Sequence, residues 1–335
     1  MKKFLVVLTI LLAVGLISGC SPSNSETSPE ADSSGEPVKV IVVLDWVPNT
    51  NHTGLFVAKD KGFYADQGLD VEIIQPTSGG AAQLVAAQQA DFGVSYQEEV
   101  TLARTNDIPI KSIAAVIQHN TSGFASPKDK NITSPKDFAG KKYGGWGSPM
   151  EHAMLESLVT KHGVSINTVE EVNIGSADFM TSVQKDVDFA WIFYGWDGIR
   201  AELQNVPLNI IMIKDEDPAL DYYTPVLIAS EKTIAEKPEV VKKFLAATTE
   251  GYEFAISNPD DSAEILLDNA PELDAELVKA SQRWLADKYQ DDAPFWGVQK
   301  AEVWQRYADW MLNYGLLEKE IDPAAAFTND YLPKK

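Results

Sequence analysis

The sequence predicts an α/β protein with two lobes, each built on a mostly parallel sheet, a hinge between them and a helical C-terminal return. From residue 38, short apolar runs alternate with amphipathic stretches, and the same alternation recurs from residue 140. After TPVLIAS the apolar spacing becomes helical through most of the remaining chain. We therefore expect the chain to cross between lobes near residues 121–127 and 223–229. The expected boundaries are 38–122 plus 226–335 for lobe I and 123–225 for lobe II.

The elements of the first half follow from local pattern changes. KVIVVL is a continuous β-branched run, as in a strand covered on both faces, and the turn DWVPNTN follows it. HTGLFVAKDKGFYADQGL has helical spacing that ends near Gly62 or Gly68. The later elements of this half are the strands VEIIQP, DFGVSY and IKSIAAVIQ and the helices AAQLVAAQQA and QEEVTLARTN.

The second half repeats this alternation before the helical return. Its predicted strands are KKYGGWG, VEEVNIGS, DFAWIFYGW and LNIIMIKD, and its helices are SPMEHAMLESLVTKHG, ADFMTSVQKD and DGIRAELQN. KPEVVKKFLAATTEGYEFAISNP then reads as a long helix with good apolar periodicity. Helices between nearly all strands predict parallel connections on both faces of each sheet.

The N-terminus has the form of an export signal. MKKF supplies a basic start, LVVLTILLAVGLI an apolar run, and LISGC a small-residue end that resembles a bacterial lipobox. This predicts a signal peptide over 1–19 rather than a membrane span. Cys20, the only cysteine, would carry a lipid, and the serine-, proline- and acid-rich segment 20–37 would be a flexible tether. We expect an extracytoplasmic protein anchored to the cell membrane through Cys20.

Composition excludes several classes of function. The formal net charge of −21 argues against nucleic-acid binding, which needs basic patches. Only four arginines occur, which disfavours a strongly anionic ligand held by guanidinium forks. The four histidines lack the spacing of metal ligands, and we expect neither a metal nor a cofactor. Glu98 and Glu99 are adjacent and should point to different sides, so no glycosidase-type pair is predicted.

Aromatic and acidic residues follow the predicted strands. Ligands of open parallel sheets bind beyond the carboxyl ends of the strands. A flat aromatic ligand could stack on such rings while its amino groups donate to the carboxylates. The alternative is that several of these residues are core, as is usual for tryptophan. The residues at these positions are Asp45, Trp46, Asn49, Thr77, Ser78, Tyr96, Trp146, Ser148, Trp191, Tyr194, Trp196 and Asp197.

The stretch YGGWGSPME combines a glycine-rich turn with a helix start. It lacks the Gly-Lys-Ser/Thr of a P-loop and the Gly-x-Ser-x-Gly of a nucleophile elbow. Ser148 suits an N-cap, Pro149 the first turn, and Glu151 the partner in a capping box. That explanation leaves Gly144, Gly145 and Gly147 around Trp146 unexplained. We therefore expect these glycines to form a ligand cradle with free backbone amides.

Longer motifs carry a resemblance to a known family. DWVPNTNHTGLFVAKDKGFYADQGLDVEI, GGAAQLVAAQQADFGVSY and KPEVVKKFLAATTEGYEFAISNP resemble periplasmic-type solute-binding proteins of the thiamine-precursor and sulfonate-binding family, over residues 38 to 335. Trp46-x-Pro-Asn-x-x-His52, Gly-Ser-Pro-Met-Glu151 and Tyr194-Gly-Trp-Asp197 are similar to the members that bind formylaminopyrimidine. The resemblance implies the type II periplasmic-binding-protein fold.

The resemblance also implies roles for individual residues. Trp46 and one of Tyr96, Trp146 and Trp191 would sandwich the ligand ring. Asn49 and the backbone at 145–148 would hydrogen-bond ring nitrogens or the formamide. Asp197, with Glu151 as a second candidate, would accept from the exocyclic amine, although the family often has a glutamate at the position of Asp197. Asp45 and His52 would lie behind these residues. The implied ligand contacts are Trp46, Asn49, Tyr96, Gly144, Gly145, Trp146, Gly147, Ser148, Glu151, Trp191, Tyr194 and Asp197.

The expected function is therefore non-enzymatic capture for import. Lobe closure would trap a thiamine-derived aminopyrimidine, which a monomeric protein would deliver to an ABC permease and its ATPase. One alternative is binding of another small solute, such as an alkanesulfonate. The other is synthesis of the thiamine pyrimidine, because His52 matches the histidine that a similar fungal enzyme consumes with iron. TPVLIAS lacks the cysteines of the fungal pattern.

Overall fold

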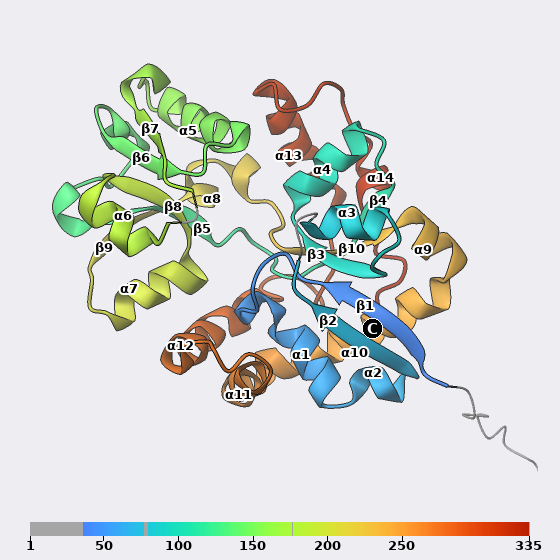
Figure 1. The fold of residues 1–335 in the computed structure, drawn as a ribbon. Coiled ribbons are helices and arrows are strands. Elements are labelled where there is room, and N and C mark those ends of the chain that lie inside the picture. Colours follow the sequence, from blue (N-terminus) through green and yellow to red (C-terminus); the bar gives the residue numbers. More distant parts are fainter. Residues whose placement is uncertain (1–35, 77–79, 176, 335) are drawn as a thin grey trace, which may run out of the picture. The chain divides into compact units, whose positions relative to one another are not determined.

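The computed structural model describes residues 36–76, 80–175 and 177–334. The predicted signal peptide, Cys20, nearly all of the predicted tether, and Thr77 and Ser78 lie outside these residues. The elements below all belong to one compact unit, Pro37–Lys335 (Figure 1). No helix among the described residues is both long enough and apolar enough to span a bilayer.

The first sheet has the strand order β2-β1-β3-β10-β4. β1 pairs in parallel with β2, from Val38 opposite Leu69, and also in parallel with β3. β10 is antiparallel to both β3 and β4, so four of the five strands point the same way. Its strands are β1 (Val38–Val43), β2 (Leu69–Ile74), β3 (Phe92–Ser95), β4 (Ile110–Ala115) and β10 (Val226–Ser230).

The second sheet repeats this plan with the order β7-β6-β8-β5-β9. β6 is parallel to β7 and β8, whereas β5 is antiparallel to β8 and β9. In each sheet the reversed strand, β5 or β10, is the one the chain enters after leaving the other sheet. Its strands are β5 (Ser122–Pro127), β6 (Lys142–Gly145), β7 (Glu170–Asn173), β8 (Phe189–Phe193) and β9 (Leu208–Met212).

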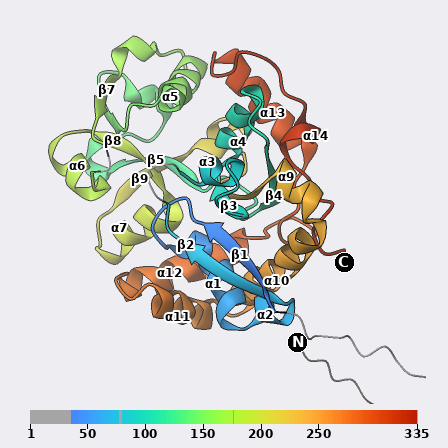
Figure 2. The same ribbon diagram turned by 45° about the vertical axis from the view of Figure 1, so that its right-hand side comes forward.

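Helices cover both faces of each sheet, as Figures 1 and 2 show. Alternate residues of β1 divide between two apolar clusters: Val40 and Val42 pack with α1 and α10, and Val43 packs with α3 and α4. The helices are α1 (Thr53–Asp60), α2 (Phe63–Asp66), α3 (Gly80–Ala86), α4 (Gln97–Thr105), α5 (Pro149–Lys161), α6 (Phe179–Lys185), α7 (Ile199–Leu203), α8 (Ile213–Glu216), α9 (Glu231–Glu236), α10 (Pro238–Ser257), α11 (Pro259–Asn269), α12 (Ala275–Leu285), α13 (Ala301–Asn313) and α14 (Pro323–Ala326).

The two connections between the sheets lie side by side. Asn120 of the first connection donates from Nδ2 to the carbonyl of Leu220 in the second, at 3.0 Å, and from its amide to Asp221 Oδ1, also at 3.0 Å. His119 Nδ1 lies 2.7 Å from Asp221 Oδ2. A bend at one connection therefore requires a matching bend at the other.

The predicted helix from His52 ends near Gly62, one of the two expected ends, because Gly62 adopts a left-handed φ of 81° that separates α1 from α2. Predicted strands end earlier than expected: LNIIMIKD is a strand only through Met212, after which α8 begins. The strand predicted through Trp196 ends at Phe193, where Tyr194–Gly198 forms a π-helical turn. β4 ends at Ala115, before the predicted end at Gln118.

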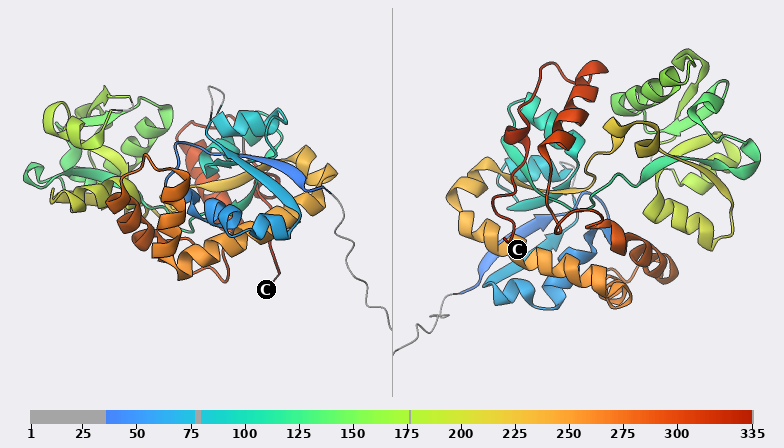
Figure 3. Two further views of the ribbon diagram at one scale, coloured as in Figure 1. Left: turned by 60° about the horizontal axis from the view of Figure 1, so that its bottom comes forward. Right: turned by 180° about the vertical axis from the view of Figure 1, so that it is seen from behind.

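The C-terminal return is helical, as predicted, and serves both sheets (Figure 3). α10 packs under the first sheet, where Phe244 stacks on Phe92 with ring centroids 4.0 Å apart. α13 instead contacts the second-sheet helix α5, since the Tyr307 hydroxyl lies 3.8 Å from Met150 Sδ. The return therefore holds contacts from both sheets in one chain segment.

Candidate functional site

The loop after β1 presents Trp46 to solvent from a tightly bonded turn. Asn49 Oδ1 accepts from the Asn51 amide at 2.9 Å, and its Nδ2 donates to the Val47 carbonyl at 3.0 Å. The Asn49 side chain is thus bonded within its own turn and is buried. Trp46, in contrast, is 56 % exposed. The ring of Trp46 is therefore open to contact by a flat ligand, and its role as a ligand contact stays a prediction.

Asp45, His52 and Tyr96 form a buried network behind this loop. His52 Nδ1 accepts from the Asn49 amide at 3.2 Å, so the ring proton sits on Nε2, which donates to Asp45 Oδ1 at 2.6 Å. The Tyr96 hydroxyl donates to Asp45 Oδ2 at 2.9 Å. Burial raises the pKa of Asp45, but the His52 and Tyr96 interactions outweigh it and leave that pKa lowered. The network orients the Trp46 loop, and the place of Asp45 and His52 behind the ligand contacts stays a prediction.

The turn before α5 is closed by Glu151. Ser148 Oγ accepts from the Glu151 amide at 3.2 Å, while Glu151 Oε2 accepts from the Ser148 amide at 3.0 Å, which confirms the predicted capping box. Glu151 also accepts from the Trp146 amide at 3.1 Å and from the Tyr143 hydroxyl at 2.6 Å. A carboxylate has about four acceptor positions, so these donors occupy nearly all of them. The geometry favours a structural role for Glu151 over that of amine acceptor.

The glycines of this turn make room for protein contacts. A Cβ on Gly145 would lie 2.1 Å from Glu151 Oε1, and one on Gly144 would lie 2.8 Å from a Val187 methyl. Gly147 has a φ of 78°, which L side chains rarely adopt. The expectation of free amides around Trp146 was wrong, because Glu151 accepts from the amides of Trp146 and Ser148. Whether Gly144, Gly145 and Gly147 touch a ligand stays a prediction.

Trp146 heads an aromatic ladder on the second sheet. It is 50 % exposed and stacks on Trp191, with ring centroids 5.4 Å apart and planes at 19°. Trp191 in turn stacks on Phe193, two residues along β8, at 6.0 Å. Trp191 Nε1 is buried and has no hydrogen-bond partner among the described residues. One face of this ladder is therefore open at Trp146, and Trp191 is its packed support.

The turn after β8 holds Tyr194 and Asp197 in different settings. The Tyr194 hydroxyl donates to Glu202, and its ring lies 5.1 Å from that of Trp284 on α12. Ser281 Oγ of α12 donates to the Gly195 carbonyl, which joins the second-sheet turn to a C-terminal helix. Burial, partly offset by Arg200, raises the pKa of Asp197 to about 6. Asp197 is thus a partly desolvated carboxyl at the carboxyl end of β8.

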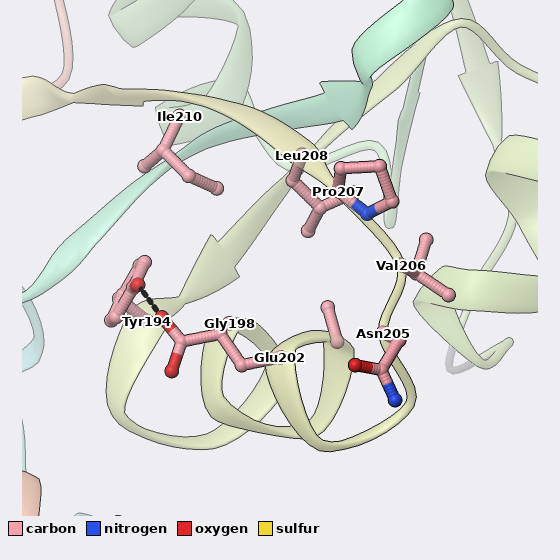
Figure 4. A pocket seen from close by; sticks show the side chains of 9 residues that line it. Tyr194, Gly198, Glu202, Asn205, Val206, Pro207, Leu208 and Ile210 are labelled. Atoms are coloured by element: carbon pink, nitrogen blue, oxygen red, sulfur yellow. Dashed lines mark hydrogen bonds between the residues drawn. The ribbon is translucent and has the colours of Figure 1, made fainter.

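A cavity of about 410 Å³ lies beside Tyr194, between α7 and β9 (Figure 4). Figure 4 shows the Tyr194–Glu202 hydrogen bond on one side and Leu208 and Ile210 on the other. Among the residues that line this cavity Tyr194 is the single predicted ligand contact, and neither Trp46 nor Trp146 is one of them.

One acidic residue at the strand ends was missed from the sequence. Glu98 lies on the first turn of α4, two residues after Tyr96, and is half-buried. Burial, together with the charges of Glu99 and Glu151, raises its pKa to about 7. Glu99 instead accepts from Ser95 Oγ, a hydrogen bond that Glu98 does not share. The described residues contain no cluster of metal-ligating side chains.

Comparison with known proteins places these features in a family. The NMT1/THI5-like family model matches residues 49–262. A formylaminopyrimidine-binding protein of Halalkalibacterium halodurans is 29% identical, over 98% of this chain and 99% of that protein. The riboflavin-binding protein RibY of Chloroflexus aurantiacus is 25% identical, over 99% of each. A 4-amino-5-hydroxymethyl-2-methylpyrimidine phosphate synthase of Legionella pneumophila is 23% identical, over 88% of this chain and 92% of that protein.

The fold comparison agrees with the predicted architecture. The periplasmic aliphatic sulphonate-binding protein SsuA of Escherichia coli superposes with a TM-score of 0.68 at 15% identity, over 90% of this chain and 95% of that one. This likeness, with the matching pair of five-stranded sheets, confirms the predicted periplasmic-binding-protein fold. At this level of identity it carries no information about the ligand.

Proposed function

Because this chain belongs to the NMT1/THI5-like family, we propose that it captures a thiamine-derived aminopyrimidine, similar to formylaminopyrimidine, for import by an ABC transporter. The observation that carries the proposal is a pair of half-exposed tryptophans at the carboxyl ends of β1 and β6, Trp46 at 56 % and Trp146 at 50 %. β1 belongs to the first sheet and β6 to the second, so the two tryptophans follow strands of different sheets. Two such rings suit a flat heteroaromatic ligand better than an alkyl sulfonate, and no arginine supports them.

Capture would proceed by closure of the two lobes. Trp46 of lobe I and Trp146 of lobe II would stack on opposite faces of the ring, supported by the Asp45 network and by Trp191 respectively. Only a ligand that touches both lobes favours the closed form. The paired connections at His119–Asn120 and Leu220–Asp221 would provide the hinge, since they are the segments that both lobes share.

Import further requires an extracytoplasmic location and a membrane partner. We propose that the protein is a monomer tethered by a lipid on Cys20 and that a permease with its ATPase recognises the closed form. The N-terminal sequence, with its basic start, apolar run and LISGC, supports this location.

A pyrimidine-forming enzyme is the second candidate, favoured by the position of His52 and by synthases among the relatives. In this chain both His52 ring nitrogens are bonded, to the Asn49 amide and Asp45, and the side chain is 0 % exposed. A buried imidazole that holds the Trp46 loop together fits a structural role for His52 better than a role as the reactant that an enzyme consumes. Incubation with iron and pyridoxal phosphate should leave the protein mass unchanged and release no pyrimidine. Loss of mass at His52 would instead establish the enzyme.

Calorimetric titration of the purified protein tests the binding proposal. The panel is formylaminopyrimidine, its deformylated amine, hydroxymethylpyrimidine, thiamine, riboflavin and taurine. We expect formylaminopyrimidine or its amine to bind most tightly, with one site per chain. Tighter binding of taurine or riboflavin, or the absence of binding by every pyrimidine, would contradict the proposal.

A further inference from the structure

The carboxyl groups around the two strand-end tryptophans are nearly all occupied. Asp45 accepts from His52 and Tyr96, and Glu99 accepts from Ser95. Glu151 accepts from Tyr143 and two backbone amides. Asp197 interacts with the Phe193 amide and with the charge of Arg200. Each of these groups therefore has at least one hydrogen-bond donor, although burial still raises the pKa of Asp197 and Glu99.

Glu98 is the exception. No hydrogen bond or ion pair joins its carboxyl group to any other described residue, although it is half-buried. The charged and titratable groups that face it are Glu99 on its own helix, Glu151 on α5, Tyr222 before β10 and Tyr307 on α13. None of these supplies a positive charge. A desolvated carboxyl group with acidic neighbours and no donor is costly to maintain, and such groups concentrate at functional sites.

The position of Glu98 connects the two sheets. It lies on α4, which follows β3 at the edge where the Asp45 network ends, while Glu151 belongs to the second-sheet helix α5. Tyr307, whose hydroxyl reaches Met150 Sδ at 3.8 Å, comes from the C-terminal return and stacks on Tyr222 at 4.1 Å. The groups that interact electrostatically with Glu98 therefore come from both sheets and from the C-terminal return. An amine on a ligand held between Trp46 and Trp146 would supply the donor that Glu98 lacks.

We propose that Glu98 receives the amine-bearing edge of the ligand, through one hydrogen bond to the exocyclic amine and one to the adjacent ring nitrogen. This inference rests on the proposed function and replaces Asp197 as the main amine acceptor. The two-point contact shares one proton between the carboxyl group and the ring nitrogen, so it forms with either partner protonated. In its ionised form the carboxylate can only accept, so it selects an aminopyrimidine over an oxopyrimidine, which presents a carbonyl where the amine would donate.

Substitutions at Glu98 separate this role from a structural one. Glu98→Ala should weaken binding of the aminopyrimidine by roughly 10- to 100-fold, because it removes charge-assisted hydrogen bonds. Glu98→Gln keeps one acceptor and one donor at the same edge, so binding should stay within about fivefold of the natural protein. Both variants should unfold at the same or a higher temperature than the natural protein without ligand, because the unpaired charge is removed. A structural residue would lose stability instead.

The pH dependence provides a second readout. Burial and the charges of Glu99 and Glu151 raise the pKa of Glu98 to about 7 in the folded state, above its unfolded value. Ionised Glu98 therefore destabilises the folded protein. This destabilisation is absent at low pH, where the carboxyl group is protonated, and complete above the folded-state pKa. The stabilisation of Glu98→Gln should be greatest above pH 7 and should disappear near pH 4.

Glu99→Gln is the matched control, since it removes the neighbouring charge but leaves Glu98 in place. It should bind the amine and its oxo analogue as the natural protein does. Asp197→Asn tests the competing acceptor and should change affinity less than Glu98→Ala does. Unchanged affinity in Glu98→Ala, while the natural protein binds formylaminopyrimidine, overturns this inference and leaves the proposed function standing. Failure of the natural protein to bind any aminopyrimidine overturns both.

Discussion

Replacing Trp46 with alanine should reduce ligand affinity far more than it reduces stability. Trp46 is 56 % exposed, so less than half of its surface is withdrawn from water in the ligand-free protein. Full truncation of a buried tryptophan destabilises by about 3–5 kcal/mol, and we expect about 1–2 kcal/mol here. Aromatic stacking on a flat heterocycle contributes about 1–3 kcal/mol per ring, which corresponds to a loss of roughly 5- to 150-fold in affinity.

Trp296→Ala is the matched control, because it should reduce stability without reducing ligand affinity. Trp296 is fully buried, stacks on Tyr252 at 4.3 Å and donates from Nε1 to the Val116 carbonyl at 3.2 Å. Its loss should destabilise by about 3–5 kcal/mol while the folded fraction binds normally. Urea unfolding of both variants gives the change in the free energy of unfolding, and calorimetric titration with formylaminopyrimidine gives the change in affinity. If Trp46→Ala lost as much stability as Trp296→Ala, or bound the ligand as well as the natural protein, Trp46 would not be a contact residue.

Three further predictions concern the supports of the site. Glu151→Ala should destabilise the protein by about 3–4 kcal/mol in urea unfolding, because three hydrogen-bond donors lose their acceptor. His152→Ala, at the exposed neighbour, should cost less than about 0.5 kcal/mol. Equal losses in the two variants would refute the capping role of Glu151. Gly145→Ala should also unfold more easily, because its Cβ would lie 2.1 Å from Glu151 Oε1, and a neutral result would show that the turn adapts. The hydrogen bond to Asp221 raises the pKa of His119, so its stabilisation is complete below the unfolded pKa and is lost as pH rises through the folded one. His119→Gln should remove that pH dependence from unfolding curves, and an unchanged slope would contradict it.

The strand pattern was predictable because burial on both faces leaves a local signal. KVIVVL and the apolar part of DFGVSY are continuous apolar runs, and each contains a strand, whereas β9 in LNIIMIKD is an edge strand in which only alternate residues are buried. The end of β8 was not predictable, because the apolar run WIFYGW continues into the π-helical turn without a change in composition. The reversed direction of β5 and β10 also has no local signal, since it depends on where the chain crosses between sheets.

In the candidate site, too, local features could be predicted from the sequence and long-range contacts could not. The capping box of Ser148 and Glu151 could be predicted because all of its atoms lie within four residues. The role of Gly144 could not, because the contact that requires glycine is with Val187, more than forty residues away. Glu98 was missed for a similar reason: local spacing separates it from Glu99, but the residues that surround it, Glu151 and Tyr307, come from distant helices.

A crystal structure of the full chain with formylaminopyrimidine is the most direct test of the central claim, that two strand-end aromatics trap an amine-bearing ring without changing it. The account predicts an intact formamide, with one ring face on Trp46 and the other on Trp146, and the amine edge toward Glu98. A ligand seated beside Tyr194 in the cavity of about 410 Å³, or one found hydrolysed or joined to His52, would contradict it.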